Sequence, residues 1–242
     1  LDQQPNVILT CFGDMMRVPG STESLMQARA RGADVRFVYS PLDALKLAKE
    51  NPSKEVIFFG IGFETTAPST AATLEAARVG NVTNFSVFSN HVAIEPPLQA
   101  LINGGDTNVD GFIAPGHVAT IVGTKAFDFL PTQHNKPTVI AGFEPLDILQ
   151  AVDMLLTQFL ARDLYGKPAR VENQYARVVS EQGNAVALKL MSRVFEVRKT
   201  FEWRGLGWIP ESGLAIAEEY AQWDAEKRFD IPGNRVPDPA AC

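Results

Sequence analysis

Short apolar runs alternate with helix-like segments along most of the 242-residue chain, and this alternation limits the fold more than any other feature. The apolar runs are rich in Val, Ile and Phe and have the length of buried strands. The expected strands are residues 7–11, 34–39, 55–60, 84–89, 109–114 and 137–141. The expected helices between and after them include 25–31, 69–78, 96–103 and 145–162, and another begins at Ser40 and Pro41, a typical cap and first helical residue. Such alternation predicts an α/β fold with mainly parallel sheets flanked by helices.

The fold is expected to consist of two similar α/β domains, because two short stretches recur. Pro-Leu-Asp begins at both Pro41 and Pro145, and Gly-Phe-Glu occurs at both 62–64 and 142–144. Coincidence combined with ordinary helix-cap chemistry is the alternative reading, since the matches are short. The expected division is an α/β region at 1–165, the remainder of the α/β halves at 166–229, and a proline-rich connector at 230–242. Within the second region, one helix is expected at 185–195 and a second somewhere within 211–229.

Composition excludes several classes of protein. Hydrophobic residues make up 45% and charged residues 21% of the chain, which is ordinary for a globular protein and excludes a disordered one. The net charge of −6 argues against a nucleic-acid partner, and no apolar run reaches the roughly 20 residues that a bilayer span needs. Two cysteines fit a reducing, cytoplasmic compartment better than a disulfide framework.

Candidate functional residues follow the expected strands, because ligands of parallel α/β sheets bind at the carboxyl ends of strands. Four loops stand there: 12–21, 60–68, 114–118 and 141–145. The residues expected on one polar rim are Asp14, Arg17, Glu64 and His117 as the candidate catalytic set, with Thr65, Thr66 and Glu144 beside them.

Each of these residues also has a structural interpretation. Asp14 and Glu144 suit the starts of helices, and Thr65 and Thr66 suit helix N-caps. Arg17 could pair with a carboxylate for stability alone, and His117 could be a buried, hydrogen-bonded histidine. The other histidines, His91 and His134, are expected to be structural or solvated.

Several catalytic motifs are absent from the sequence. It has no G-x-x-x-x-G-K-[ST] phosphate loop and no G-x-S-x-G nucleophile elbow, and Gly60-x-Gly62 lacks the third glycine of a dinucleotide-binding motif. Three scattered histidines and two distant cysteines have no metal-ligand spacing. The residues alone therefore predict an α/β protein with a polar rim.

Six stretches, in order, resemble the HypD family of hydrogenase-maturation proteins. They are Phe-Gly-Asp-Met-Met-Arg-Val-Pro-Gly-Ser at 12–21, Gly-Phe-Glu-Thr-Thr-Ala-Pro at 62–68, Ala-Pro-Gly-His-Val at 114–118, Ala-Gly-Phe-Glu-Pro-Leu-Asp-Ile-Leu at 141–149, Glu-Asn-Gln-Tyr at 172–175 and Trp-Arg-Gly-Leu-Gly at 203–207. The first two are long enough to be specific, and the six span nearly the whole chain.

The resemblance implies a cytoplasmic scaffold for the iron centre of NiFe hydrogenases. Such proteins, with the small chaperone HypC, hold iron while two cyanides and one carbon monoxide are added, and they receive cyanide from HypE. The resemblance also implies a 4Fe-4S cluster in a smaller region beside the two α/β domains. HypC and HypE are the expected partners.

The sequence departs from this family in its cysteines. The family's Cys-Gly-Gly-His and Cys-Pro-Val-Cys motifs are absent, and residues 235–242 resemble the entry to the cluster-binding stretch, with Cys242 as its first metal ligand. The chain is therefore expected to be an internal fragment that by itself holds neither the cluster nor the transient iron, since one thiolate cannot hold a cubane. Cys11 is expected to be a small buried hydrophobe.

Two other functions remain open from the residues alone. One is a nucleotide-using small-molecule enzyme of the α/β class, against which the missing phosphate loop argues. The other is an interaction module whose rim docks partners without iron.

Overall fold

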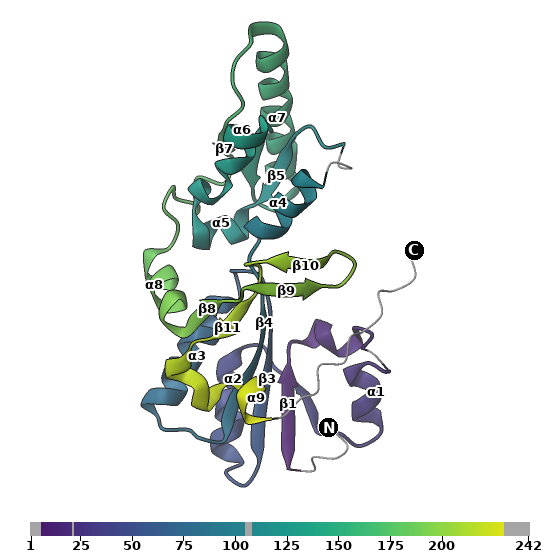
Figure 1. Ribbon diagram of the computed structural model, residues 1–242, viewed down its shortest axis with the longest axis vertical. Coiled ribbons are helices and arrows are strands. Elements are labelled where there is room, and N and C mark those ends of the chain that lie inside the picture. Colours follow the sequence, from purple (N-terminus) through teal and green to yellow (C-terminus); the bar gives the residue numbers. More distant parts are fainter. Residues whose placement is uncertain (1–5, 21, 105–107, 230–242) are drawn as a thin grey trace. The chain divides into compact units, whose positions relative to one another are not determined.

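A computed structural model describes residues 6–20, 22–104 and 108–229, and it divides into two compact units (Figure 1). Unit 1 comprises Leu1–Gly62, Thr66–Val92 and Leu190–Cys242, and unit 2 comprises Phe63–Thr65 and Ala93–Lys189. The chain therefore leaves unit 1, builds unit 2 and returns. The expected connector at 230–242 lies outside the described residues.

Unit 1 is built on a parallel sheet with strand order β2-β1-β3-β4. Its strands are β1 (Val7–Cys11), β2 (Val35–Phe37), β3 (Glu55–Gly62) and β4 (Phe85–His91). In register, Leu9 of β1 lies between Val35 of β2 and Ile57 of β3. All four strands fall where the apolar runs predicted them.

Helices cover both faces of this sheet because successive strand residues point to opposite sides. Ile8 and Phe58 face one side and pack with residues of α2 (Pro41–Glu50) and α3 (Ala67–Val79). Cys11 and Val35 face the other side and pack with the 3₁₀ helix η1 (Gly13–Arg17) and with α1 (Leu25–Ala30). The predicted start of α2 is confirmed: the Ser40 side chain accepts from the Asp43 amide, the Asp43 carboxylate accepts from the Ser40 amide, and Pro41 opens the helix.

The returning segment of unit 1 adds two antiparallel pairs. They are β8 (Phe195–Val197) with β11 (Leu214–Ile216), and the hairpin of β9 (Thr200–Trp203) with β10 (Gly207–Pro210). η3 (Glu218–Trp223) and α9 (Ala225–Arg228) follow.

The helix expected within 211–229 is therefore limited to the short η3 and α9, and a strand precedes them. Leu214 and Ile216 alternate with period two and pair with β8, and the Ser89 hydroxyl of β4 donates to the Leu214 carbonyl at 2.8 Å. Tyr220 and Trp223 are buried in the unit 1 core. Long-range strand pairing and burial override the local helical pattern here.

Unit 2 is built on a smaller parallel sheet with strand order β5-β6-β7. Its elements are α4 (Glu95–Asn103), β5 (Phe112–Pro115), α5 (Gly116–Val122), η2 (Thr124–Phe127), α6 (Phe129–His134), β6 (Thr138–Ala141), α7 (Pro145–Tyr165) and β7 (Val171–Asn173), and α8 (Ala185–Val194) leads back to unit 1. Val139 and Ala141 pack against Ala151 of α7 on one face of the sheet. Ala114 and Ile140 pack on the other face, in a cluster that includes Val118 of α5.

The expected α/β class with parallel sheets flanked by helices is confirmed in both units. η2 and α6 were not predicted. Over the part of the chain that the structure describes, no helix combines the length and the hydropathy needed to span a bilayer.

Candidate functional site

The strand order of unit 1 points to the loop after β1. In the order β2-β1-β3-β4 the connections reverse direction between β1 and β3, and ligands of such sheets bind outside this switch point. The loop after β1 forms η1, which carries two exposed predicted residues, Asp14 and Arg17. Asp14 Oδ1 accepts from the Met15 amide at 3.0 Å. Arg17 forms no ion pair with another described residue, and its side chain is exposed.

Cys11 ends β1 directly beneath this loop and belongs to the core. Its side chain is buried, and its Sγ contacts Met16 Sδ at 3.6 Å. Burial, and secondarily the Asp14 carboxylate, raises the pKa of the Cys11 thiol. The expected buried position of Cys11 is thus observed, and the thiol is held in its unreactive protonated form.

This position predicts that Cys11 resists alkylation in the folded protein. Iodoacetamide at pH 8 should modify Cys11 at least tenfold more slowly in native protein than in urea, because the thiolate forms only after exposure. Peptide mass mapping distinguishes Cys11 from Cys242, so the alkylation rate of each thiol is measured separately. Equal rates for Cys11 with and without urea would contradict the buried position.

The carboxyl end of β4 carries a buried histidine, His91, which lies against β3 and α3. His91, which ends β4, is fully buried, with Nε2 at 3.0 Å from Thr70 Oγ1 and Nδ1 at 3.3 Å from Thr66 Oγ1. Burial lowers the pKa of His91 to about 4, so the imidazole is neutral. Gly60 leaves room for it, since a Cβ there would stand 2.9 Å from His91 Nε2. The expected structural role of His91 agrees with this burial, and Thr66 bonds the Ile61 carbonyl and His91 rather than capping α3.

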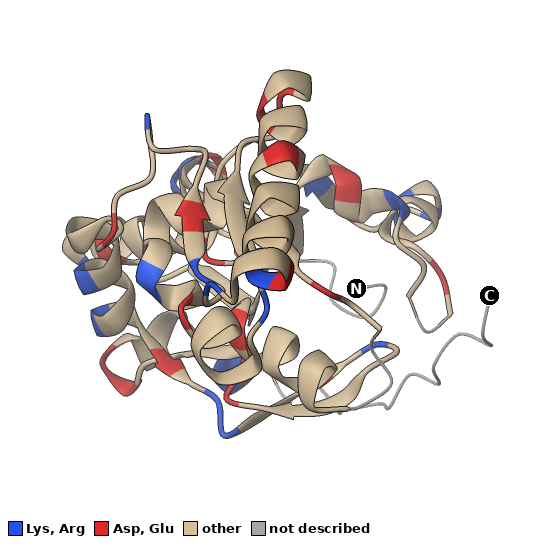
Figure 2. Cartoon of the chain, turned by 90° about the horizontal axis from the view of Figure 1, so that it is seen from above, with Lys and Arg blue, Asp and Glu red and all other residues tan. Residues whose placement is uncertain are grey.

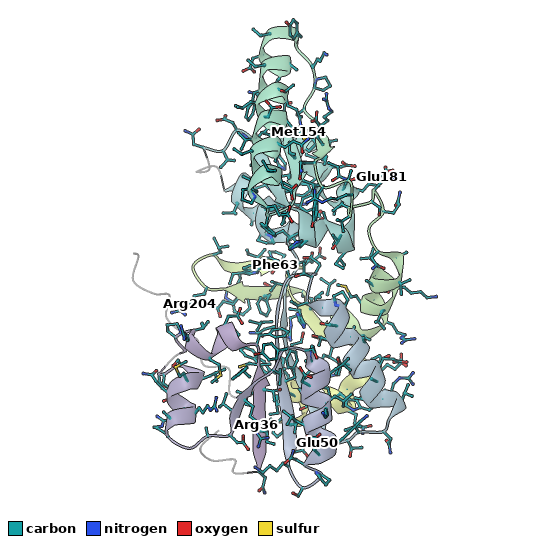
Figure 3. The ribbon with its side chains drawn as sticks, turned by 180° about the vertical axis from the view of Figure 1, so that it is seen from behind. Arg36, Glu50, Phe63, Met154, Glu181 and Arg204 are labelled. Atoms are coloured by element: carbon teal, nitrogen blue, oxygen red, sulfur yellow. The ribbon has the colours of Figure 1, made fainter. Side chains whose placement is uncertain are left out.

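Unit 2 contains a pocket of about 540 Å³ at the carboxyl ends of its strands. Its walls are mainly apolar, with polar groups from Thr65, His117 and Thr120. The lining residues are Phe63, Thr65, Ile94, Pro115, His117, Val118, Thr120, Ile121 and Phe143. His117 is exposed on the first turn of α5, and its ring meets the Phe143 ring edge-on at 4.8 Å between centroids. Figure 3 labels Phe63, which directly follows β3 in the chain.

Glu64 stands between two lining residues of this pocket and is itself buried, with 7% of its surface exposed. Its Oε1 accepts the Ile94 amide at 3.0 Å, whereas the buried Oε2 has no hydrogen-bond partner among the described residues. Burial raises the pKa of the Glu64 carboxyl. Desolvation is the physical cause, because burial disfavours the charged form of a carboxyl.

Tyr175 and Arg177 pack beside the strand ends of unit 2, next to His117. The Tyr175 ring lies 6.1 Å from the His117 ring, and Arg177 stacks on Tyr175 at 4.4 Å. Arg177 also binds both carboxylate oxygens of the buried Asp147, at 2.9 and 2.6 Å, and this pair lowers the pKa of Asp147. Gly116 lets Tyr175 approach, because a Cβ at Gly116 would meet Tyr175 Cδ1 at 2.7 Å.

The predicted rim residues divide between the two units. Asp14 and Arg17 belong to unit 1, whereas Glu64, Thr65, His117 and Glu144 belong to unit 2. The two Gly-Phe-Glu copies both follow strands but differ in environment: Glu64 is buried, and Glu144 is exposed with its carboxylate 3.8 Å from Arg177. The functional roles of Asp14, Arg17, Glu64 and His117 stay predictions.

Sequence reasoning assigned no role to Tyr175, Arg177 or Asp147. The signals were the Glu-Asn-Gln-Tyr stretch and the acid in the first turn of α7, but the contact spans about 30 residues of chain, which no local pattern reveals.

A resident metal site is not formed by the residues that the structure describes. They contain no group of three or more His, Cys, Asp or Glu side chains placed to hold an ion. Their single cysteine, Cys11, is enclosed in the core. The donor set of a 4Fe-4S cluster therefore does not fit the described residues, and Cys242, the predicted first ligand, lies outside them.

Fold and rim together define a class: a parallel α/β protein with polar and glycine-rich loops at its strand ends and without a nucleotide or nucleophile motif. The family described as "HypD: Hydrogenase formation hypA family" matches residues 1–242. The chain belongs to this family.

Curated relatives agree with this assignment. A hydrogenase maturation factor HypD of Rhodobacter capsulatus is 52% identical over 94% of this chain and 59% of the relative. HypD2 of Bradyrhizobium diazoefficiens is 49% identical over 100% of this chain and 64% of the relative. HypD of Escherichia coli is 50% identical over 98% of this chain and 62% of the relative. The chain thus spans about three-fifths of the length of the relatives it matches.

Proposed function

We propose that the protein containing this chain acts in hydrogenase maturation, as a scaffold on which an Fe(CN)2CO group is assembled together with HypC and HypE. The observation that carries the proposal is the family match over residues 1–242, in a group of relatives named hydrogenase maturation factors. The chain covers only part of those relatives, so the activity, the partners and a cytoplasmic location are proposed for the whole protein.

The residues at the strand ends suit the iron group under assembly rather than a resident cofactor. Iron-bound cyanide presents nitrogen lone pairs that accept hydrogen bonds, and Arg17 offers fixed N–H donors with no internal ion pair among the described residues. His117 lines the 540 Å³ pocket of unit 2, and the buried Glu64 carboxyl lies in the chain between two of its lining residues. Soft thiolates suit low-valent iron, and in this proposal they come from outside the described residues, as would the ligands of a 4Fe-4S cluster.

The test replaces Arg17 by alanine in the full-length protein. Arg17→Ala should abolish hydrogenase activity in cells and the infrared bands of iron-bound cyanide and carbon monoxide in the purified scaffold, while the far-ultraviolet circular dichroism stays unchanged. Arg29→Ala is the matched control, because Arg29 is also an exposed arginine of unit 1 and lies on α1. Full maturation by Arg17→Ala would remove Arg17 from the site.

Two further measurements on the full-length protein distinguish the scaffold from the two other functions. A nucleotide-using enzyme would gain thermal stability from ATP in the absence of HypC, since ligand binding raises stability by mass action. A docking module would lose HypC binding in Arg17→Ala while its wild-type form retains no iron. Either result would replace the scaffold proposal.

A further inference from the structure

The outer face of α7 carries a row of exposed leucines that unit 2 does not cover. Leu146, Leu149, Leu156, Leu160 and Leu164 are each 55% to 78% exposed. Their spacing of three, seven, four and four residues follows the helical period, so they share one side of this 21-residue helix. We call these five residues the α7 stripe. Figure 1 shows α7 as the long helix of unit 2, and Figure 3 labels Met154 in its middle.

The opposite side of α7 already forms the core contact of unit 2. Ala151 is buried against Val139 and Ala141, with Ile148 and Leu155 packed around them. Gln158 is buried as well, with its amide hydrogen-bonded to the Thr138 carbonyl and the Arg170 amide. The core of unit 2 therefore does not use the leucines of the α7 stripe. A helix that is apolar on both sides is normally covered on both sides.

The size of the α7 stripe distinguishes it from scattered surface leucines. Five leucines at these exposures present on the order of 500 Å² of apolar surface, the size of the largest apolar patch on a typical monomer, which is often functional. Such a patch indicates an interaction surface.

The charges beside the α7 stripe define the chemistry of its occupant. Asp153, exposed near the centre of the row, forms no ion pair with any described residue, and Asp163 is exposed near the far end. Arg162 is held by Asp163 at 2.9 Å and stacks on Phe159, so its charge is already matched. Figure 2 marks the acidic and basic positions along the chain. Among the described residues, the unpaired charge along the stripe is therefore the single carboxylate of Asp153.

We propose that the α7 stripe docks an amphipathic helix of another protein, whose leucine-like apolar row is flanked by Lys or Arg. Leucines at helical spacing are the anchors of helix-in-groove and helix-pair recognition, and a basic residue opposite Asp153 supplies the missing ion partner. The inference rests on unit 2 alone and does not depend on the proposed function.

Other occupants fit less well. A second copy paired antiparallel would bring two Asp153 carboxylates near one another, and like charges repel. An anionic membrane is disfavoured because interfacial helices carry Lys and Arg beside their apolar face.

The experiment measures binding of a fluorescent 21-residue peptide to the full-length protein by anisotropy. The peptide has leucines at i, i+3, i+7 and i+11 with lysines beside them, and a scrambled peptide of the same composition controls for attraction to the net negative charge. Leu156→Glu and Leu160→Glu should each weaken binding at least tenfold, and Asp153→Asn severalfold with a reduced salt dependence. Leu42→Glu, in unit 1 and 54% exposed, is the matched control and should bind as wild type.

Several outcomes would overturn the proposal. Equal binding of the scrambled peptide, or unchanged binding by Leu156→Glu with a native circular dichroism spectrum, would show that the α7 stripe does not recognise the helix. A dimer in analytical ultracentrifugation that Leu156→Glu dissociates would assign the stripe to a second copy. Sedimentation with phosphatidylcholine or phosphatidylserine vesicles that Leu156→Glu abolishes would assign it to a membrane.

Discussion

Replacing Gly116 by alanine is expected to lower the free energy of unfolding of unit 2 by about 3 kcal/mol, because the added methyl group has no space. A Cβ at Gly116 would stand 2.3 Å from the Ala141 carbonyl oxygen and 2.7 Å from Tyr175 Cδ1. Ala141 pairs with Pro115 in the sheet, so its backbone cannot retreat without breaking the register of β5 and β6. Tyr175 is in turn held by the Arg177 stack.

Urea denaturation followed by hydrogen exchange of residues 112–122 measures this loss within unit 2. Gly13→Ala is the matched control, since a Cβ at Gly13 has no neighbour within 4 Å and that residue has no positive φ. It should change stability by less than about 0.5 kcal/mol. A Gly116→Ala protein as stable as Gly13→Ala would refute the close approach of Tyr175 and β6 to this turn.

The second large effect is a loss of stability on acidification caused by His91. Its folded-state pKa of about 4 lies below the ordinary unfolded value of about 6.5. Above pH 6.5 the imidazole is neutral in both states, and its contribution to stability is fully present. Between pH 6.5 and 4 only the unfolded state takes up the proton, so stability falls as pH falls, and the loss levels off below pH 4 at about 3 kcal/mol.

The measurement is the free energy of unfolding at pH 7 and pH 4.5 for the wild type and His91→Gln. The variant should lose markedly less stability between these pH values, whatever its stability at pH 7. Asp34 and Glu75, whose partners lower their pKa values to about 2, lose their contributions mainly below pH 4. Identical slopes for wild type and His91→Gln would contradict a neutral, buried His91.

Local signals predicted the elements well where the required interactions are local. The capping box of Ser40 and Asp43 spans four residues, and β1, β3 and β6 are apolar runs bounded by polar or turn residues, so short windows contain what determines them. The prediction was poorest within 211–229, where Leu214 and Ile216 pair with β8 and Tyr220 enters a distant core. There the deciding contacts lie far away in the sequence.

The site was partly predictable for the same reason. The strand-end loops with Asp14, Arg17, Glu64 and His117 could be located because parallel strands place their carboxyl ends at one edge. The two Gly-Phe-Glu copies look equivalent in the sequence, but their glutamates differ in burial. The Glu64 carboxyl is enclosed, whereas the Glu144 carboxyl is exposed to solvent. The exposed side of α7 could likewise not be predicted, because the spacing of its leucines does not indicate which of them the sheet covers.

The sequence by itself determined the α/β class, most strand and helix positions and the family, since these depend on periodicity, caps and matched stretches of residues. Only the tertiary structure decided that the chain leaves unit 1 and returns to it, that His91 is enclosed and neutral, that Arg177 and Asp147 brace Tyr175, and that the α7 stripe is left uncovered. Burial and the partners of a charge are properties of the packed chain. They arise from residues brought together across tens of positions, and for that reason no local pattern contains them.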